Sequence, residues 1–132
     1  MPDGDICYRT LKYAMELVEN DSVEPMEAVR KMGLGYEAYE ALAISVFCAV
    51  LHKENTKFAI ELAANQDGAS DTCASITAAI LGAYKGEAAF PKKWVKKLQY
   101  RELVESIADK LCTAVCANDD FSMDIDDIDE ED

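Results

Sequence analysis

The chain has 132 residues, half of them hydrophobic, and a formal net charge of −13 at pH 7. This length suits one domain with a real core. Nine of its acids and none of its bases lie in residues 119–132, so the remaining body carries only −4. Because phosphate contacts need cations, this tail argues against a nucleic-acid partner.

The sequence shows neither a signal peptide nor a membrane-spanning segment. Residues 1–5 have no basic start followed by an apolar stretch, so they do not read as a signal peptide. The longest apolar run, residues 41–51, is too short to cross a bilayer. We therefore expect a cytoplasmic protein with no membrane partner.

Hydrophobic spacing predicts helices nearly throughout the chain, and no strand or hairpin pattern appears. The first helix is expected over residues 6–19, and a short second one from Pro25 to near Gly33. A long apolar helix over residues 36–52 is expected at the centre, with His52 at its end, where a cation suits the helix dipole. The fold class is therefore an all-α, compact helical bundle over residues 1–117.

The next helix is expected to start at an Asn55 or Thr56 cap and to run to residue 64. Its expected buried stripe consists of Phe58, Leu62 and Ala63.

A polar turn then leads into a helix of small residues over 71–84, with Asp71 and Thr72 in its first turn. Because this helix is small or apolar on every side, we expect it to be buried all round. A carboxylate and a hydroxyl at its start suit a cation or a phosphate group. Ser70 is also a good N-cap residue, and from spacing alone the plain cap is the favoured interpretation.

Lysines 92, 93, 96 and 97 form one basic patch on a helix expected over 91–98, and a solvated face is favoured over an anion site. The last helix, 101–117, carries apolar residues at regular spacing (Leu103, Ile107, Leu111 and Val115). Residues 118–132 mix acids with a few hydrophobic residues, so disorder is the expectation and docking onto a basic partner the alternative.

Five cysteines form an odd set without a Cys-x-x-Cys pair. Cys112 and Cys116 lie four residues apart, but with one histidine in the chain a zinc site is poorly supported. Buried free thiols in a reducing compartment are favoured. Cys73 follows Thr72 in the first turn of the small-residue helix, where both an activated thiolate and a packed core residue are open interpretations.

Ordered motifs from Glu40 to Leu111 resemble the C-terminal part of the ADP-ribosylglycohydrolase family, which includes the dinitrogenase-reductase-activating glycohydrolases. The matching pieces are Glu40-Ala41-Leu42-Ala43-Ile44, Ala63-Ala64-Asn65-Gln66-Asp67-Gly68, Ser70-Asp71-Thr72, Ala78-Ala79-Ile80-Leu81-Gly82-Ala83-Tyr84, Gly86, Pro91, Trp94, Leu98 and Arg101-Glu102-Leu103-Val104-Glu105.

The resemblance implies an all-α domain with two Mg²⁺ or Mn²⁺ ions that hydrolyses a glycosidic bond to ADP-ribose. Asp71 and Thr72 match metal ligands of the family's Gly-Asp-Ser/Thr-Asp-Ser/Thr motif, whereas Ala69 stands where its first Asp belongs. Asp67 is a weak substitute ligand, and Asn65, Gly68 and Ser70 are weak ligand-binding candidates. The resemblance also places Trp94 in a packing position. Because the family uses no nucleophilic cysteine at the position of Cys73, it implies that Cys73 packs in the core.

The family's other metal motif, Thr-Asp-Asp, does not occur in this sequence. The expected function is thus an ADP-ribosylglycohydrolase-like half-domain that is catalytically incomplete alone. One alternative is half of a split hydrolase, completed by a partner chain with the N-terminal half. Another is a non-catalytic module that binds ADP-ribose or an ADP-ribosylated protein. Homo-oligomerisation is a further expectation, and an unrelated acidic interaction module conflicts with the ordered matches.

Overall fold

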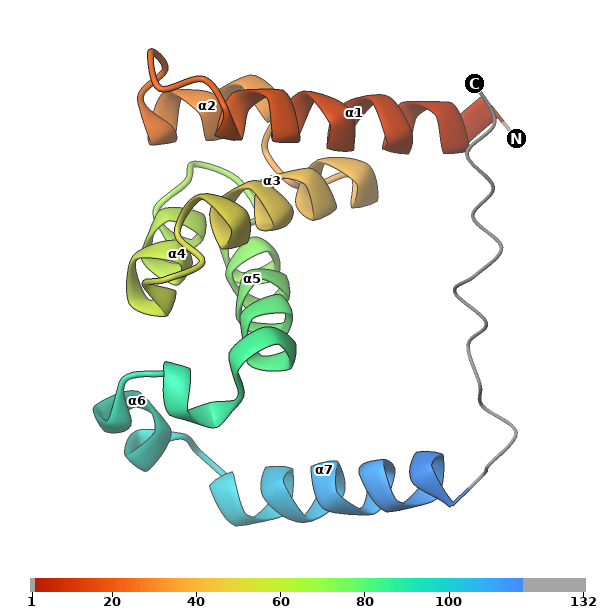
Figure 1. Cartoon of the computed structure of the whole chain (residues 1–132), viewed down its shortest axis with the longest axis vertical. Coiled ribbons are helices and arrows are strands. Elements are labelled where there is room, and N and C mark those ends of the chain that lie inside the picture. The colour runs from red at the N-terminus through yellow and green to blue at the C-terminus, as the bar shows by residue number, and fades with distance from the viewer. Residues whose placement is uncertain (1, 118–132) are drawn as a thin grey trace. The chain divides into compact units, whose positions relative to one another are not determined.

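The computed structural model describes residues 2–117, and the expectations for residues 118–132 lie outside it. Within these residues the protein is all-α, as expected, with seven α-helices, one 3-10 turn and no strand (Figure 1). The chain divides into a first unit, residues 1–92, and a second, residues 93–132. Each unit is described by itself.

The first unit is built around one central helix. Helix α3 (Ala38–Leu51) packs against α1 (Pro2–Val18) on one side and against α4 (Thr56–Ala64) and α5 (Ser70–Lys85) on the other (Figure 1). Helix α2 (Pro25–Met32) closes one end of this arrangement through contacts with α1, α3 and α4. The central position predicted for the long apolar helix is confirmed.

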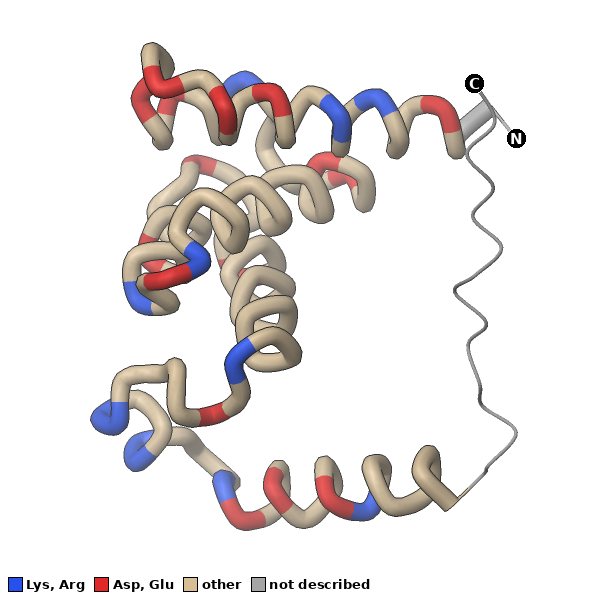
Figure 2. Tube along the Cα trace, in the orientation of Figure 1, with Lys and Arg blue, Asp and Glu red and all other residues tan. Residues whose placement is uncertain are grey.

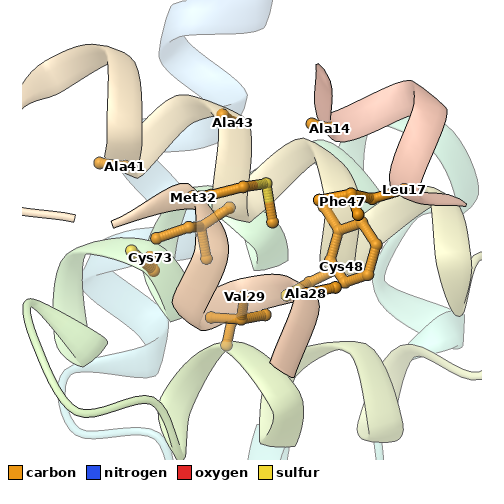
Figure 3. Packing of buried hydrophobic residues seen from close by; sticks show 12 residues of the cluster. Ala14, Leu17, Ala28, Val29, Met32, Ala41, Ala43, Phe47, Cys48 and Cys73 are labelled. Atoms are coloured by element: carbon orange, nitrogen blue, oxygen red, sulfur yellow. The ribbon is translucent and has the colours of Figure 1, made fainter. Parts of the chain in front are cut away.

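Large and small apolar side chains interlock in the core of this unit (Figure 3). Phe47 and Ile44 of α3 are at most 1% exposed, and Val29 of α2 is fully buried. Burial of each such side chain contributes about 1.5–3 kcal/mol, so α3 supplies much of the stability of the unit. Charges are nearly absent from α3 and α5 except at their ends (Figure 2).

Polar groups inside the α3–α5 contact are satisfied by the backbone. The Ser45 hydroxyl lies 2.7 Å from the carbonyl of Ala41 and 3.1 Å from that of Cys73. The Thr77 hydroxyl donates to the Cys73 carbonyl at 2.8 Å. These bonds let two polar residues sit in the core without an unpaired group.

Helix α4 shows how packing overrides local expectation. Its Asn55 cap is confirmed, since the Asn55 side chain accepts from the N–H of Phe58 at 3.2 Å. The predicted stripe is wrong at Phe58, which is 52% exposed, whereas Ala59 is fully buried. The Phe58 ring instead stands edge-on to the ring of His52, with centroids 6.3 Å apart.

The second unit contains α7 (Arg101–Cys116) and most of α6 (Lys92–Lys97). The four lysines of the basic patch are all exposed, as a solvated face requires. Trp94 is 39% exposed, which does not support the packing position implied by the resemblance. The apolar stripe of α7 is exposed as well, with Leu103, Ile107, Leu111 and Val115 between 47% and 64%.

Candidate functional site

The turn before α5 is fastened to the loop that follows α2. The N–H of Ala69 donates to the carbonyl of Leu34 at 2.8 Å, and the Gln66 side-chain amide approaches the same oxygen at 3.4 Å. The other end of this amide accepts from the N–H of Gly68 at 2.8 Å. Gln66 is 6% exposed, so it acts as an internal clip that fixes where α5 begins.

Gly68 is required by this close approach. A Cβ at position 68 would lie 1.9 Å from the carbonyl oxygen of Leu34, which no side chain tolerates. Gly35, across the contact, has a φ of +76° and would place a Cβ 2.7 Å from the Cys73 sulfur. The two chain segments therefore meet backbone to backbone.

A half-buried acid supports the opposite side of the contact. The Glu40 carboxylate, near the start of α3, accepts from the N–H of Gly35 at 3.1 Å. A Cβ at Gly33 would lie 2.5 Å from this carboxylate, and the φ of +115° there also favours glycine. The sequence analysis gave neither Glu40 nor Gln66 a role, because no local pattern shows which backbone groups these two side chains bind.

Asp71 and Thr72 lie in the first turn of α5, as predicted, and both are exposed. The prediction that Ser70 caps this helix is wrong. The cap position is Ala69, which has no side-chain acceptor, and Ser70 is the first helical residue. Because the tether to Leu34 already positions the backbone, the helix begins one residue earlier than a serine cap would allow.

The other candidate residues make structural contacts. Asp67 forms an ion pair with Arg30, with 3.0 Å between Oδ2 and Nε, and thereby links α2 to the turn. Asn65 is exposed and ends α4, where its N–H donates to the Glu61 carbonyl. Gly68 serves the close backbone contact described above. Asp71 and Thr72 thus remain as the adjacent pair of oxygen-bearing side chains.

The two sides of α5 differ in burial, which corrects the prediction that this helix is buried all round. Cys73, Thr77 and Leu81 form the buried face against α3 and α4. The opposite face is exposed along four residues at helical spacing, namely Thr72, Ser75, Ala79 and Ala83. One candidate ligand, Thr72, therefore lies on an open face of small residues.

The thiol of Cys73 belongs to the core, as expected. Its pKa is raised chiefly by burial; the Gln66 amide opposes this, while the charges of Asp71 and Glu40 add to it. A raised pKa keeps the thiol protonated and a poor nucleophile. The expectation of buried thiols also holds for Cys48 but is wrong for Cys112 and Cys116, which are exposed.

The donor set fits the implied Mg²⁺ or Mn²⁺ only in part. A carboxylate and a hydroxyl are the hard oxygen ligands that these ions prefer, but Ala69 offers none. Among residues 2–117 no three histidine, cysteine or acidic side chains gather closely enough to hold a metal ion. A surface cavity of about 370 Å³ lies elsewhere, where Thr10 and Tyr13 of α1 meet Met32 of α2.

The first unit defines the class: an all-α domain with acidic and hydroxyl residues at the start of an inner helix. The family model for ADP-ribosylglycohydrolase matches residues 2–120, so the chain belongs to the ADP-ribosylglycohydrolase family. Members of this family depend on metal ions. No solved structure gives a significant match.

Two curated relatives share the matched region. The ADP-ribosylhydrolase ARH3 of Bos taurus is 28% identical over 111 residues, and that of Mus musculus is 27% identical over the same length. Each match covers 76% of this chain and 30% of the relative. The chain thus spans about a third of the length of these relatives. No helix within residues 2–117 is long and apolar enough for a membrane span.

Proposed function

We propose that this chain supplies Asp71 and Thr72 to one side of a Mg²⁺ or Mn²⁺ site in an ADP-ribosyl hydrolase, and that it is catalytically incomplete alone. The observation that carries the proposal is the open face of α5. Thr72 and three small residues are exposed there, while the opposite face is packed. A helix that is packed on one face and exposed on the other can bind a further segment of the same kind of domain on its exposed face.

The occupant we propose for this face is the complementary part of an ADP-ribosylglycohydrolase domain, carrying the Thr-Asp-Asp ligands. Three considerations support this occupant over a second copy of the chain. The matched region covers 30% of each ARH3 relative, so most of such a domain lies outside it. Thr-Asp-Asp is absent from the sequence, and a second copy would not supply it. Small side chains also permit the close helix contact that a domain interior requires.

The role of the chain's own residues follows from their chemistry. Asp71 offers a carboxylate and Thr72 a hydroxyl to a hard cation, and both are held by a turn that the Gln66 clip fixes. When bound, the metal ions would supply Lewis-acid activation of water for cleavage of a glycosidic bond to ADP-ribose. The ligand set on this chain lacks the carboxylate that Ala69 replaces.

Calorimetric titration with Mn²⁺ and Mg²⁺ tests the ligand assignment. We expect weak binding to the native chain that disappears in Asp71→Ala. Ala69→Asp should tighten binding at least about tenfold, because it adds a carboxylate to the set. Ala69→Asn is the matched control, since it adds a similar side chain without the charge. If neither the native chain nor Ala69→Asp binds either ion, the enzymatic proposal fails.

Co-purification tests the proposed occupant. A segment with Thr-Asp-Asp from an ADP-ribosylglycohydrolase should bind the native chain and restore hydrolysis of an ADP-ribosylated peptide. Ala79→Arg, on the open face, should abolish this binding without unfolding the chain, and Glu87→Arg outside that face is the control. Binding without hydrolysis would instead support the non-catalytic ADP-ribose or protein-binding module. Self-association blocked by Ala79→Arg would identify a second copy as the occupant and overturn this proposal.

A further inference from the structure

Two exposed thiols lie side by side on α7. Cys112 and Cys116 are separated by one helical turn, and their sulfur atoms are 4.0 Å apart. Both are free and exposed. The other three cysteines are buried or half-buried in the first unit, so the pair is the most accessible dithiol among the described residues.

The helix opposes closure of this pair into a disulfide. Residues four apart on a helix have Cβ atoms about 5–6 Å apart. A disulfide requires about 3.5–4.5 Å between these atoms, so bond formation would distort α7. The two sulfurs are therefore held together as thiols.

A single soft ion fits between the sulfurs without moving the backbone. With a metal–sulfur bond of about 2.3 Å, sulfurs at this separation subtend an angle of about 120° at the ion. Such an angle suits a centre with three or four ligands. Thiolates select soft ions such as Cu(I) and Zn²⁺ over hard ones.

We propose that Cys112 and Cys116 form a two-thiolate site for a soft, closed-shell monovalent metal ion, for which Cu(I) is the probe. Zn²⁺ is the less suitable ion because its structural sites take four protein ligands. Within residues 2–117 no third histidine, cysteine or acid completes such a group around the pair. Cu(I) accepts fewer ligands, so two thiolates and one small ligand from solution suffice.

The exposure of Cys112 and Cys116 should direct a metal ion to this pair rather than to the buried thiols. Burial raises the pKa of Cys48 to about 12, which keeps that thiol protonated and out of reach. Since metal ligation requires thiolates, the ion displaces the protons of both cysteines when it binds.

Anaerobic competition between the full chain and a colorimetric Cu(I) chelator tests the site. We expect one Cu(I) per chain. Cys112→Ser and Cys116→Ser should each weaken binding at least about tenfold, because losing a ligand should cost no less than losing a supporting residue. Cys7→Ser, outside the pair, should leave the affinity unchanged.

A second variant separates pairing from the number of thiols. Cys112→Ser combined with Ser106→Cys keeps two exposed thiols on α7 but places them about 15 Å apart along the helix. This double variant should bind as weakly as Cys112→Ser alone. Affinity equal to that of the native chain, or retention of Cu(I) by Cys112→Ser/Cys116→Ser, would overturn the proposal. A ratio of one ion per two chains would also overturn it, since two chains would then share the site.

Discussion

Helices α3 and α7 are of similar length and both carry regular apolar residues, yet they differ in what covers them. Helix α3 contacts α1, α2, α4 and α5, and seven of its residues are buried. No residue of α7 is buried. The difference shows that apolar spacing predicts where a helix forms, whereas burial depends on which neighbours the chain provides.

The largest effect is expected when the same substitution, isoleucine to alanine, is made in both helices. Ile44→Ala removes a fully buried side chain and should lower the free energy of unfolding by about 2–5 kcal/mol. Ile107→Ala removes one that is 55% exposed and should change it by less than about 0.5 kcal/mol. Urea denaturation followed by circular dichroism measures both. An equal loss from the two variants would mean that α7 is covered in solution.

A smaller effect is expected where the first unit is most tightly packed. Gly68→Ala forces the turn away from the Leu34 carbonyl and should destabilise the protein by about 1–3 kcal/mol, the range seen for overpacked sites. Gly4→Ala adds the same methyl group to α1, where nothing lies within 4 Å of it. That control should be neutral or stabilising, since alanine favours a helix. Equal destabilisation of the two variants would contradict the close contact at Gly68.

The smallest effect compares an ion pair that joins the turn between α3 and α4 to the end of α5 with an ion pair inside α7. Glu54 accepts from Lys85 at 2.9 Å, and this hydrogen bond and charge lower the pKa of Glu54 below its usual 4.5. A depressed carboxyl pKa stabilises the folded state above the unfolded-state pKa, and the benefit is lost as pH falls below it. Glu54→Gln should therefore show a shallower loss of stability below pH 4.5 than the native chain.

The pair between Arg101 and Glu105 is local to α7 and provides the comparison. Glu105→Gln should lower the melting temperature at neutral pH less than Glu54→Gln does, because a contact within one helix links no separate segments. Thermal melts at several pH values would measure both variants. A larger change in Glu105→Gln than in Glu54→Gln would contradict this prediction.

The sequence predicts the helices well because apolar periodicity and end signals are local. The last helix, expected over residues 101–117, is observed as Arg101–Cys116, and the small-residue helix differs by one residue at each end. The first helix begins four residues earlier than expected, at Pro2, because its first turn carries no apolar pattern. Ends without a hydrophobic signal are the hardest to place.

The candidate site was predicted less completely because its geometry depends on segments far apart in sequence. The motif places Asp71 and Thr72 in the first turn of α5, and the structure agrees. No local pattern reveals that Leu34 binds the N–H of Ala69, which removes the need for the Ser70 cap. The pairing of Asp67 with Arg30 spans 37 positions and is equally invisible to local spacing.

The Gln66 clip affects how the start of α5 would bind a cation. Because the amide already joins Gly68 to the Leu34 loop, the start of α5 is preorganised and needs no coupled folding when an ion arrives. Binding heats measured there should report coordination and dehydration of the ion alone, with little change in heat capacity. Replacing the clip with Gln66→Ala would convert the same event into one that also orders a loop.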